Sequence, residues 1–199
     1  MSFDKKAQSW DASSRRQQLA EAVAESIKES FKLQPGMSLL DVGAGTGLLA
    51  RRLLPYVAEI TGVDSSEGML HEFSKIGGAV KAVHSDILTY DTAARYDGIV
   101  SSMTMHHIQD IDALFCKLFS LLKPGGFIAI ADLATEDGTF HEHGNEGVCH
   151  FGFDELQLQH AARGAGFTDT AHRCIHTVEK ENGRCYDIFL FTALKPRSR

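Results

Sequence analysis

Apolar residues along this chain alternate between short continuous runs and sets with helical spacing. Continuous apolar runs are typical of parallel strands that are buried on both faces. Such runs predict strands over 38–43, 59–64, 79–84, 97–102 and 126–132. Helical spacing predicts helices over 14–31, 47–55, 66–75, 110–122 and 153–165. This alternation predicts a doubly wound α/β fold, in which right-handed crossovers bring the carboxyl ends of the parallel strands to one edge.

The pattern changes after Ala134. A polar, histidine-rich stretch over 135–152 predicts a long loop, and apolar runs near 169–179 and 186–194 predict two further strands. Asn182-Gly183 between these runs is a frequent hairpin turn, so the last two strands are expected to be antiparallel. The sequence therefore predicts a mostly parallel, seven-stranded, Rossmann-like sheet that ends in a C-terminal antiparallel hairpin.

A glycine-rich turn follows the first predicted strand, with the sequence Asp41-Val42-Gly43-Ala44-Gly45-Thr46-Gly47. Glycine permits positive φ and a close approach of the backbone to a ligand. The N–H groups of the following helix can hold a negative group. Asp64 ends the next apolar run, where a carboxylate can accept hydrogen bonds from two ribose hydroxyls. The combination predicts a site for a nucleoside cofactor.

Two residues of this turn bear on which cofactor binds. A dinucleotide fingerprint needs Gly or Ala where this chain has Leu48. A pyrophosphate would also lie near the fixed negative charge of Asp41, which is unfavourable at low dielectric. S-adenosylmethionine instead offers an ammonium group to that carboxylate. At this motif the sequence resembles the class I S-adenosylmethionine-dependent methyltransferases, whose first motif is an acidic residue followed by G-x-G-x-G.

The resemblance runs from about residue 33 to the end of the chain and implies further contacts. It places Asp64 at the ribose, with Ser65 directly after it, and Met69 on the adenine. It also implies that Asp86 and Ile87 meet the adenine amino group. An alternative role for Asp86 is a turn cap, and for Asp64 a strand-end turn. The implied cofactor-binding set is Asp41, Gly43, Ala44, Gly45, Gly47, Asp64, Ser65, Met69, Asp86, Ile87, Ser101 and Trp10. The cofactor is S-adenosyl-L-methionine and its product S-adenosyl-L-homocysteine.

The N-terminal segment, which contains Phe3 and Trp10, resembles the helical front lid of these enzymes. An aromatic face against a sulfonium gains cation–π attraction, and a lid excludes water. In the alternative interpretation these aromatic residues only dock the segment. We expect a single methyltransferase domain over 1–199, made of a lid (1–32), a cofactor-binding core (33–134) and an acceptor-side region (135–199).

His106 and His107 follow the fourth predicted strand, where the acceptor pocket of such a fold opens. Methyl transfer requires alignment and a dry site, and it requires a base only when the acceptor must lose a proton. Both histidines are candidate catalytic residues. Adjacent residues rarely face the same ligand, so we favour His106, and a structural role for it stays open.

A second histidine cluster lies in the loop predicted after the fifth strand. It contains His141, His143, Cys149 and His150. Imidazole and thiolate are good zinc ligands, but the spacing matches no metal-site pattern. We therefore predict no metal site and assign His141, His143 and His150 to the wall of the acceptor pocket, because long loops often cover functional sites.

Several absences narrow the acceptor. The stretch 101–104 lacks the Asn/Asp-Pro-Pro-aromatic motif of enzymes that methylate base amines or glutamine amides. No basic stripe with interleaved aromatics is present, and the net charge is −6, so no nucleic-acid partner is expected. The fourth-strand region and the sharp turn predicted at Lys123-Pro124-Gly125-Gly126 resemble the methyltransferase type 11 group, which includes the ubiquinone and menaquinone biosynthesis enzymes. This implies a small-molecule acceptor.

Composition adds little to the choice of function. Hydrophobic residues make up 43% and charged residues 23%, as in ordinary globular domains. No apolar stretch is long enough to span a membrane, no signal-peptide pattern is present, and the four cysteines lack C-x-x-C spacing. We expect a cytoplasmic protein without membrane insertion. A non-catalytic S-adenosylmethionine-binding module stays open as an alternative function, whereas Leu48 and Asp41 argue against a nucleotide-linked oxidoreductase.

Overall fold

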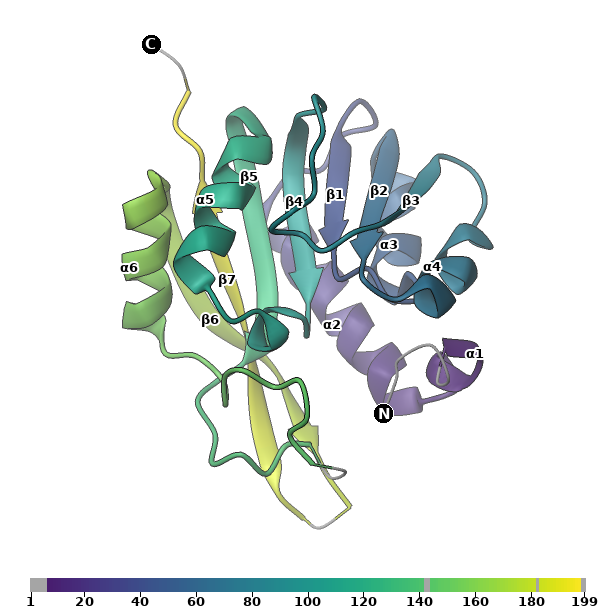
Figure 1. Cartoon of the computed structure of the whole chain (residues 1–199), viewed down its shortest axis with the longest axis vertical. Helices are drawn as coiled ribbons and strands as arrows, with labels where there is room; N and C mark the ends of the chain where they lie inside the picture. Colours follow the sequence, from purple (N-terminus) through teal and green to yellow (C-terminus); the bar gives the residue numbers. More distant parts are fainter. Residues whose placement is uncertain (1–6, 142–143, 182, 198–199) are drawn as a thin grey trace.

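The computed structural model describes residues 7–141, 144–181 and 183–197. Seven strands form one sheet in the order β3-β2-β1-β4-β5-β7-β6 (Figure 1). The strands are β1 (Ser38–Val42), β2 (Glu59–Asp64), β3 (Val80–His84), β4 (Tyr96–Ser102), β5 (Leu122–Leu133), β6 (Thr168–Glu179) and β7 (Cys185–Leu194). Neighbours from β3 to β5 pair in parallel, and β7 pairs antiparallel with both β5 and β6. The predicted fold class is confirmed.

Helices cover both faces of this sheet. They are α1 (Ala7–Trp10), α2 (Ser14–Ser30), α3 (Leu48–Leu53), η2 (Leu54–Tyr56), α4 (Glu67–Ser74), η3 (Met105–His107), α5 (Ile111–Leu121) and α6 (Glu155–Ala165). Ser13, Ser66, Asp110 and Asp154 begin the four longest of them, and each side chain accepts a backbone N–H of the first turn. These caps explain why the predicted helix positions agree with the observed ones to within a few residues.

Two hydrophobic cores result from the alternation of side chains along the strands. Leu40 and Val42 point to the face that α5 and α6 cover, and Leu39 points to the face that α2, α3 and α4 cover. Central strands are buried on both faces, which is why they read as continuous apolar runs. Figure 1 shows α5 and α6 on one side of the sheet.

The start of β5 differs from the prediction of a sharp turn over 123–126 and a strand from 126. The strand begins at Leu122, and its register with β4 shifts between Tyr96 and Gly98. Gly125 donates its N–H to the Lys195 carbonyl at 3.0 Å, and Lys195 donates to the Gly126 carbonyl at 2.8 Å. Gly125 has a φ of 80°, so the predicted turn is present as a bulge within the strand, and the bonds to the C-terminal segment hold it in place.

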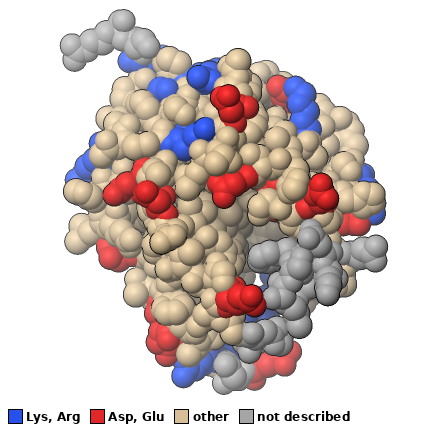
Figure 2. Space-filling view, in the orientation of Figure 1, with Lys and Arg blue, Asp and Glu red and all other residues tan. Residues whose placement is uncertain are grey.

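The carboxyl ends of the parallel strands lie at one edge of the sheet. In Figure 1 the described parts of the loop after β5 (134–141 and 144–152) and the ends of β6 and β7 extend past this edge on one side, and α1 and α2 lie on the other. Figure 2 shows a hollow in the surface at this level. None of the helices in the described part of the chain combines the length and apolar character needed to span a bilayer.

Candidate functional site

The glycine-rich turn connects β1 to α3 in a left-handed backbone conformation. Gly43, Gly45 and Gly47 have φ values of 67°, 53° and 85°. A Cβ on Gly43 would lie 2.1 Å from Oγ1 of Thr104, and one on Gly47 would lie 2.4 Å from Cδ1 of Ile76. A Cβ on Gly45 would meet no atom within 4 Å. Gly43 and Gly47 are therefore required by packing inside the protein, whereas Gly45 borders open space.

Asp64, at the end of β2, lies beside this turn. Its Oδ2 accepts the Gly45 N–H at 2.8 Å, and its Oδ1 accepts the Ser66 N–H at 2.9 Å. The sequence placed Asp64 and the glycines in one site, and the fold brings them together. The hydrogen bond to the Ser66 N–H forms the strand-end turn that the sequence offered as an alternative role for Asp64. Each carboxylate oxygen can accept a further hydrogen bond, so both roles are compatible.

Asp41, at the end of β1, is the most unusual charged group of the site. It is 2% exposed, and its Oδ2 has no hydrogen-bond partner among the described residues. Burial, and to a smaller extent the nearby charge of Asp64, raises the pKa of this carboxyl to about 8. A buried acceptor of this kind is costly unless a donor or cation reaches it. The ammonium group predicted to bind here would supply both.

Four other predicted cofactor residues border the same edge from inside the fold. Ser101 is buried and donates its hydroxyl to the Val42 carbonyl at 2.8 Å, which fixes β4 against β1. Met69 and Ile87 are buried at 2% and 7% exposure. Ala44 is also buried, so these residues can offer only apolar surface to an adenosine.

Asp86 and Ser65 are exposed. The Asp86 Oδ1 accepts the Leu88 N–H at 2.7 Å, so the turn-cap role is present in the structure. Ser65 follows Asp64 directly, and its carbonyl accepts a hydrogen bond from His84 Nε2 at 2.9 Å. The assignment of Asp86 to the adenine and of Ser65 to the cofactor site stays a prediction.

The N-terminal segment is attached to the glycine-rich turn through Asp11. This carboxylate accepts the Thr46 hydroxyl and forms a 2.6 Å ion pair with Arg51. The guanidinium of Arg16 lies 3.7 Å from the centre of the Trp10 ring, so one ring face is already covered. Phe3 lies outside the described residues. The lid prediction therefore has a structural anchor, while a contact of Trp10 with the sulfonium stays a prediction.

His106 lies on η3 and is 1% exposed. Its Nδ1 lies 2.7 Å from Oδ1 of Asp132, and its backbone N–H donates to Oδ2 of the same carboxylate at 3.2 Å. Oδ1 also accepts the Leu133 N–H at 2.8 Å. Both carboxylate oxygens thus act as acceptors, so Nδ1 of His106 is a donor and Nε2 carries the lone pair. That Nε2 is buried and has no partner in the described structure.

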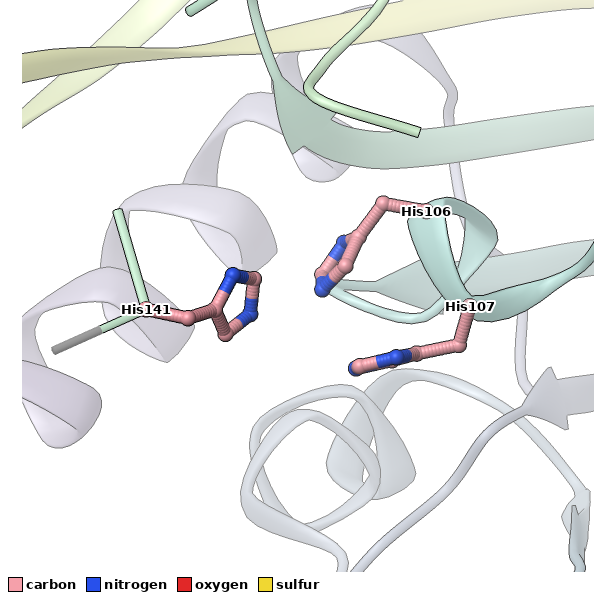
Figure 3. Close-up of side chains that lie close together, drawn as sticks. All are labelled: His106, His107 and His141. Atoms are coloured by element: carbon pink, nitrogen blue, oxygen red, sulfur yellow. The ribbon is translucent and has the colours of Figure 1, made fainter. Parts of the chain in front are cut away.

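His107 and His141 lie against His106. The ring centre of His106 is 4.1 Å from that of His107 and 5.1 Å from that of His141. Burial lowers the pKa of His107, and the neighbouring His106 lowers it further. Burial likewise lowers the pKa of His141 to about 4, with His106 and His107 adding to the effect. Figure 3 shows the three rings pointing toward one another, so adjacent His106 and His107 do face one place.

The other residues of the histidine-rich loop lie elsewhere. His143 lies outside the described residues. His150 Nε2 bonds to the carbonyl of Ile108 at 3.0 Å, and its ring packs on Phe153. His150 also lines a surface hollow between α5 and α6, together with Gln109, Gln157 and His160. Of the predicted acceptor residues, the structure brings His141 to His106 and His107 and holds His150 with other partners.

Sequence reasoning gave no role of their own to two carboxylates that hold parts of the candidate site in place. Asp132 near the end of β5 fixes the His106 ring, and Asp11 connects the lid to the glycine-rich turn. The signal for Asp132 was available, because it closes a buried apolar strand at the same sheet edge as Asp64. Asp11 had no such signal, since its partners Thr46 and Arg51 are distant in sequence.

Comparison with known sequences identifies a family. A family model described as a methyltransferase domain matches residues 13–176. An uncharacterized methyltransferase of Schizosaccharomyces pombe is 34% identical over 142 residues, which cover 62% of this chain and 50% of that protein. This chain thus spans about half the length of the first curated relatives that it matches.

Solved structures show the same fold. The DhpI–SAH complex aligns with a TM-score of 0.77 and 18% identity, covering 99% of this chain and 94% of the other. Phosphoethanolamine N-methyltransferase 2 of Haemonchus contortus, in complex with phosphomonomethylethanolamine and S-adenosylhomocysteine, aligns with a TM-score of 0.71 and 21% identity. That alignment covers 87% of this chain and 52% of the other. The expected family and fold are confirmed.

Proposed function

This chain belongs to the methyltransferase-domain family, and from that premise we propose that it transfers the methyl group of S-adenosylmethionine to a small-molecule acceptor. The bound cofactor supplies an electrophilic methyl group and a good leaving group. The protein has to bind that cofactor, align the acceptor and exclude water.

One observation carries the proposal. The buried Oδ2 of Asp41 has no hydrogen-bond partner among the described residues, and it lies where β1 runs into the glycine-rich turn. A diphosphate would bring further negative charge to this carboxylate, whereas the ammonium of an amino-acid tail would neutralise it. The free space beside Gly45 supports the same choice, because a side chain there would occupy the path of a ligand along the turn.

The remaining predicted contacts follow the edge of the sheet away from Asp41. Asp64 keeps acceptor capacity for the ribose hydroxyls, and Ile87 and Met69 supply apolar surface for the adenine. We place the acceptor on the opposite side, next to His106 and His107. The buried Nε2 of His106 has no partner among the described residues, so it is available to a group that binds here.

A small molecule fits this arrangement better than a nucleic acid. On the face drawn in Figure 2, Lys and Arg side chains lie dispersed among Asp and Glu and form no broad basic surface. Two of the structural neighbours are structures of the phosphoethanolamine N-methyltransferase 2 of Haemonchus contortus. The chemistry of this chain's own acceptor is addressed by the histidine cluster below.

Titration calorimetry with S-adenosylmethionine and S-adenosylhomocysteine tests the cofactor assignment. We expect both to bind, and Asp64→Ala to weaken binding at least tenfold, because charge-assisted hydrogen bonds contribute about 1.5–3 kcal/mol. Glu59→Gln is a matched control, since Glu59 begins the same strand at the opposite edge and pairs with Lys81. Equal affinity of wild type and Asp64→Ala would show that the ribose assignment is wrong.

Transfer itself is tested with tritiated S-adenosylmethionine and a broad panel of metabolites. Wild type should label an acceptor, and His106→Ala should lower turnover at least tenfold while its affinity for S-adenosylhomocysteine stays within a factor of about two. Tight cofactor binding without turnover on any acceptor would favour the non-catalytic binding module instead.

A further inference from the structure

Three imidazole rings meet at one point beside the cofactor edge. His106 and His107 come from η3, and His141 comes from the loop after β5. One ring nitrogen of each lies within 4.8 Å of the corresponding nitrogens of the other two. Thr104, which precedes η3, contacts the glycine-rich turn at Gly43, so the cluster lies next to the proposed methyl-donor site.

Hydrogen bonds on the far side of two rings fix which nitrogen faces the cluster. Asp132 accepts from Nδ1 of His106, and the Gly147 carbonyl lies 2.7 Å from Nδ1 of His107. A carbonyl oxygen can only accept, so Nδ1 of His107 carries the proton as well. The unprotonated Nε2 of each ring therefore carries a lone pair and is the nitrogen that can act as a metal ligand. Metal-binding histidines are held in the same way, with the second nitrogen donating to a carboxylate or a backbone carbonyl.

The surroundings of Asp132 also resemble those of the carboxylates that hold metal-binding histidines. It is fully buried, and three donors converge on it, namely the His106 ring, the His106 N–H and the Leu133 N–H. A carboxylate in this position orients the ring and increases the basicity of its other nitrogen. That other nitrogen, Nε2, has no partner in the described part of the chain.

We propose that His106, His107 and His141 bind one divalent first-row transition-metal ion, for which Zn²⁺ is the probe of choice. Lone pairs that converge on one point repel one another unless a cation or a donor lies between them. Neutral imidazole is a preferred ligand of Zn²⁺ and its neighbours in the series, and three histidines with an open fourth position form a common catalytic zinc site.

The observed spacing is wider than a bound ion requires. Zinc–nitrogen bonds of about 2.0–2.1 Å in tetrahedral geometry place ligand nitrogens roughly 3.4 Å apart. The widest observed separation is within 4.8 Å, so the cluster has to close by on the order of an ångström. His141 lies on a loop, whereas His106 is held by Asp132, so we expect His141 to make most of this movement.

The ion would act on the acceptor, a role that rests on the proposed function. Three protein ligands leave a position for an oxygen or sulfur atom of the acceptor. Coordination lowers the pKa of a hydroxyl or thiol, and the released proton passes to water. Lys180, whose ammonium lies 4.4 Å from the neighbouring Phe140 ring, adds positive charge on the same side. The acceptor class that fits is a small molecule with an ionisable O–H or S–H group.

Zinc binding to the chelator-treated full chain tests the proposal. We expect one equivalent of Zn²⁺ by calorimetry, and a Co²⁺ derivative with the visible spectrum of a low-coordinate site. His141→Ala should weaken Zn²⁺ binding by about tenfold or more without loss of stability, because this residue is on a partly exposed loop. His107→Ala should act likewise. His150→Ala is the matched control from the same loop, and it should bind Zn²⁺ as wild type does.

Each result has a distinct meaning. No Zn²⁺ binding by wild type, or undiminished binding by both His107→Ala and His141→Ala, overturns the metal site. Loss of binding in His150→Ala as well would indicate a different ligand set and also overturns it. Calorimetry with S-adenosylhomocysteine on the same samples separates the two proposals. Cofactor binding without Zn²⁺ binding would leave the proposed function intact and overturn the metal site. Zn²⁺ binding without cofactor binding would leave the metal site intact and contradict the proposed function.

Discussion

The two sides of the sheet edge hold their carboxylates differently. On the β1–β2 side, Asp41 and Asp64 lie beside the glycine-rich turn and the open space next to Gly45. On the β4–β5 side, Asp132 is buried behind the histidine cluster. Asp132 has a donor for each of its oxygens inside the protein. Asp41 has an oxygen without a partner in the described structure, although it is equally buried.

The different hydrogen bonding of Asp132 and Asp41 indicates that one buried carboxylate stabilises the fold and the other binds a ligand. A carboxylate whose donors are all internal contributes to the stability of the fold and fixes the ring that it holds. A carboxylate with an unused oxygen has a cost in the free protein, which a ligand can remove when it binds. Substitutions on the β4–β5 side should therefore change stability most, and those on the β1–β2 side should change ligand affinity and pH dependence most.

The largest effect is expected for Asp132→Ala. Three donors, including the His106 ring, would lose their acceptor in a fully buried place, and removal of one partner of such a pair costs about 3–5 kcal/mol. Urea unfolding followed by circular dichroism measures the loss. Asp137→Ala is the control, because Asp137 follows β5 on the surface and pairs with exposed Arg184. The free energy of unfolding of Asp137→Ala should match that of wild type. If Asp132→Ala lowered the free energy of unfolding only slightly, the proposed contrast between the two sides of the sheet edge would be wrong.

A smaller effect distinguishes two glycines of the turn. Gly47→Ala should destabilise the fold by about 2–3 kcal/mol, because the new Cβ would lie 2.4 Å from Ile76 and 2.9 Å from Phe73 at positive φ. Gly45→Ala also has positive φ but meets no atom within 4 Å, so about 1 kcal/mol is expected.

For cofactor affinity we expect the opposite order, with Gly45→Ala having a larger effect than Gly47→Ala. Gly45→Ala places a methyl group in the space proposed for the cofactor and should weaken S-adenosylhomocysteine at least tenfold by calorimetry. If Gly45→Ala binds normally, the ligand does not run along this part of the turn, whatever the stability of the variant.

The cofactor half of the site could be predicted from the sequence because its parts are local. Asp41 and the glycines are contiguous, and Asp64 ends the next strand, so the order β2-β1 in a parallel sheet places them together. The glycines and the two carboxylates each also had a physical role in cofactor binding that could be stated from the sequence. The structure adds a hydrogen bond between Asp64 and Gly45 that the sequence did not predict.

The acceptor half could not be predicted in the same way. His106 and His107 are separated from His141 by α5 and the whole of β5, and nothing in their spacing resembles a metal motif. Adjacent histidines were expected to point apart, but the short η3 turn directs both toward His141. Their convergence depends on how a long loop returns to the sheet edge, which follows from tertiary packing.

The last expected effect is a slope in the pH dependence of stability. Because the folded pKa of Asp41 is raised to about 8, the ligand-free protein binds a proton here that the unfolded chain loses near pH 4. Stability should therefore fall as pH rises between these values, by at most about 1.4 kcal/mol per pH unit. Thermal unfolding of wild type and Asp41→Asn from pH 5 to 8 isolates the contribution, since other groups titrate alike in both.

Saturating S-adenosylhomocysteine sharpens the same measurement, because its amino-acid tail brings an ammonium group to Asp41 and favours the ionised carboxylate. The slope that distinguishes wild type from Asp41→Asn should then become much smaller or vanish. A slope that persists with ligand bound would place the ammonium elsewhere. Equal slopes for both proteins without ligand would show that Asp41 has a partner in solution, and the electrostatic argument for an amino-acid tail over a diphosphate would lose its basis.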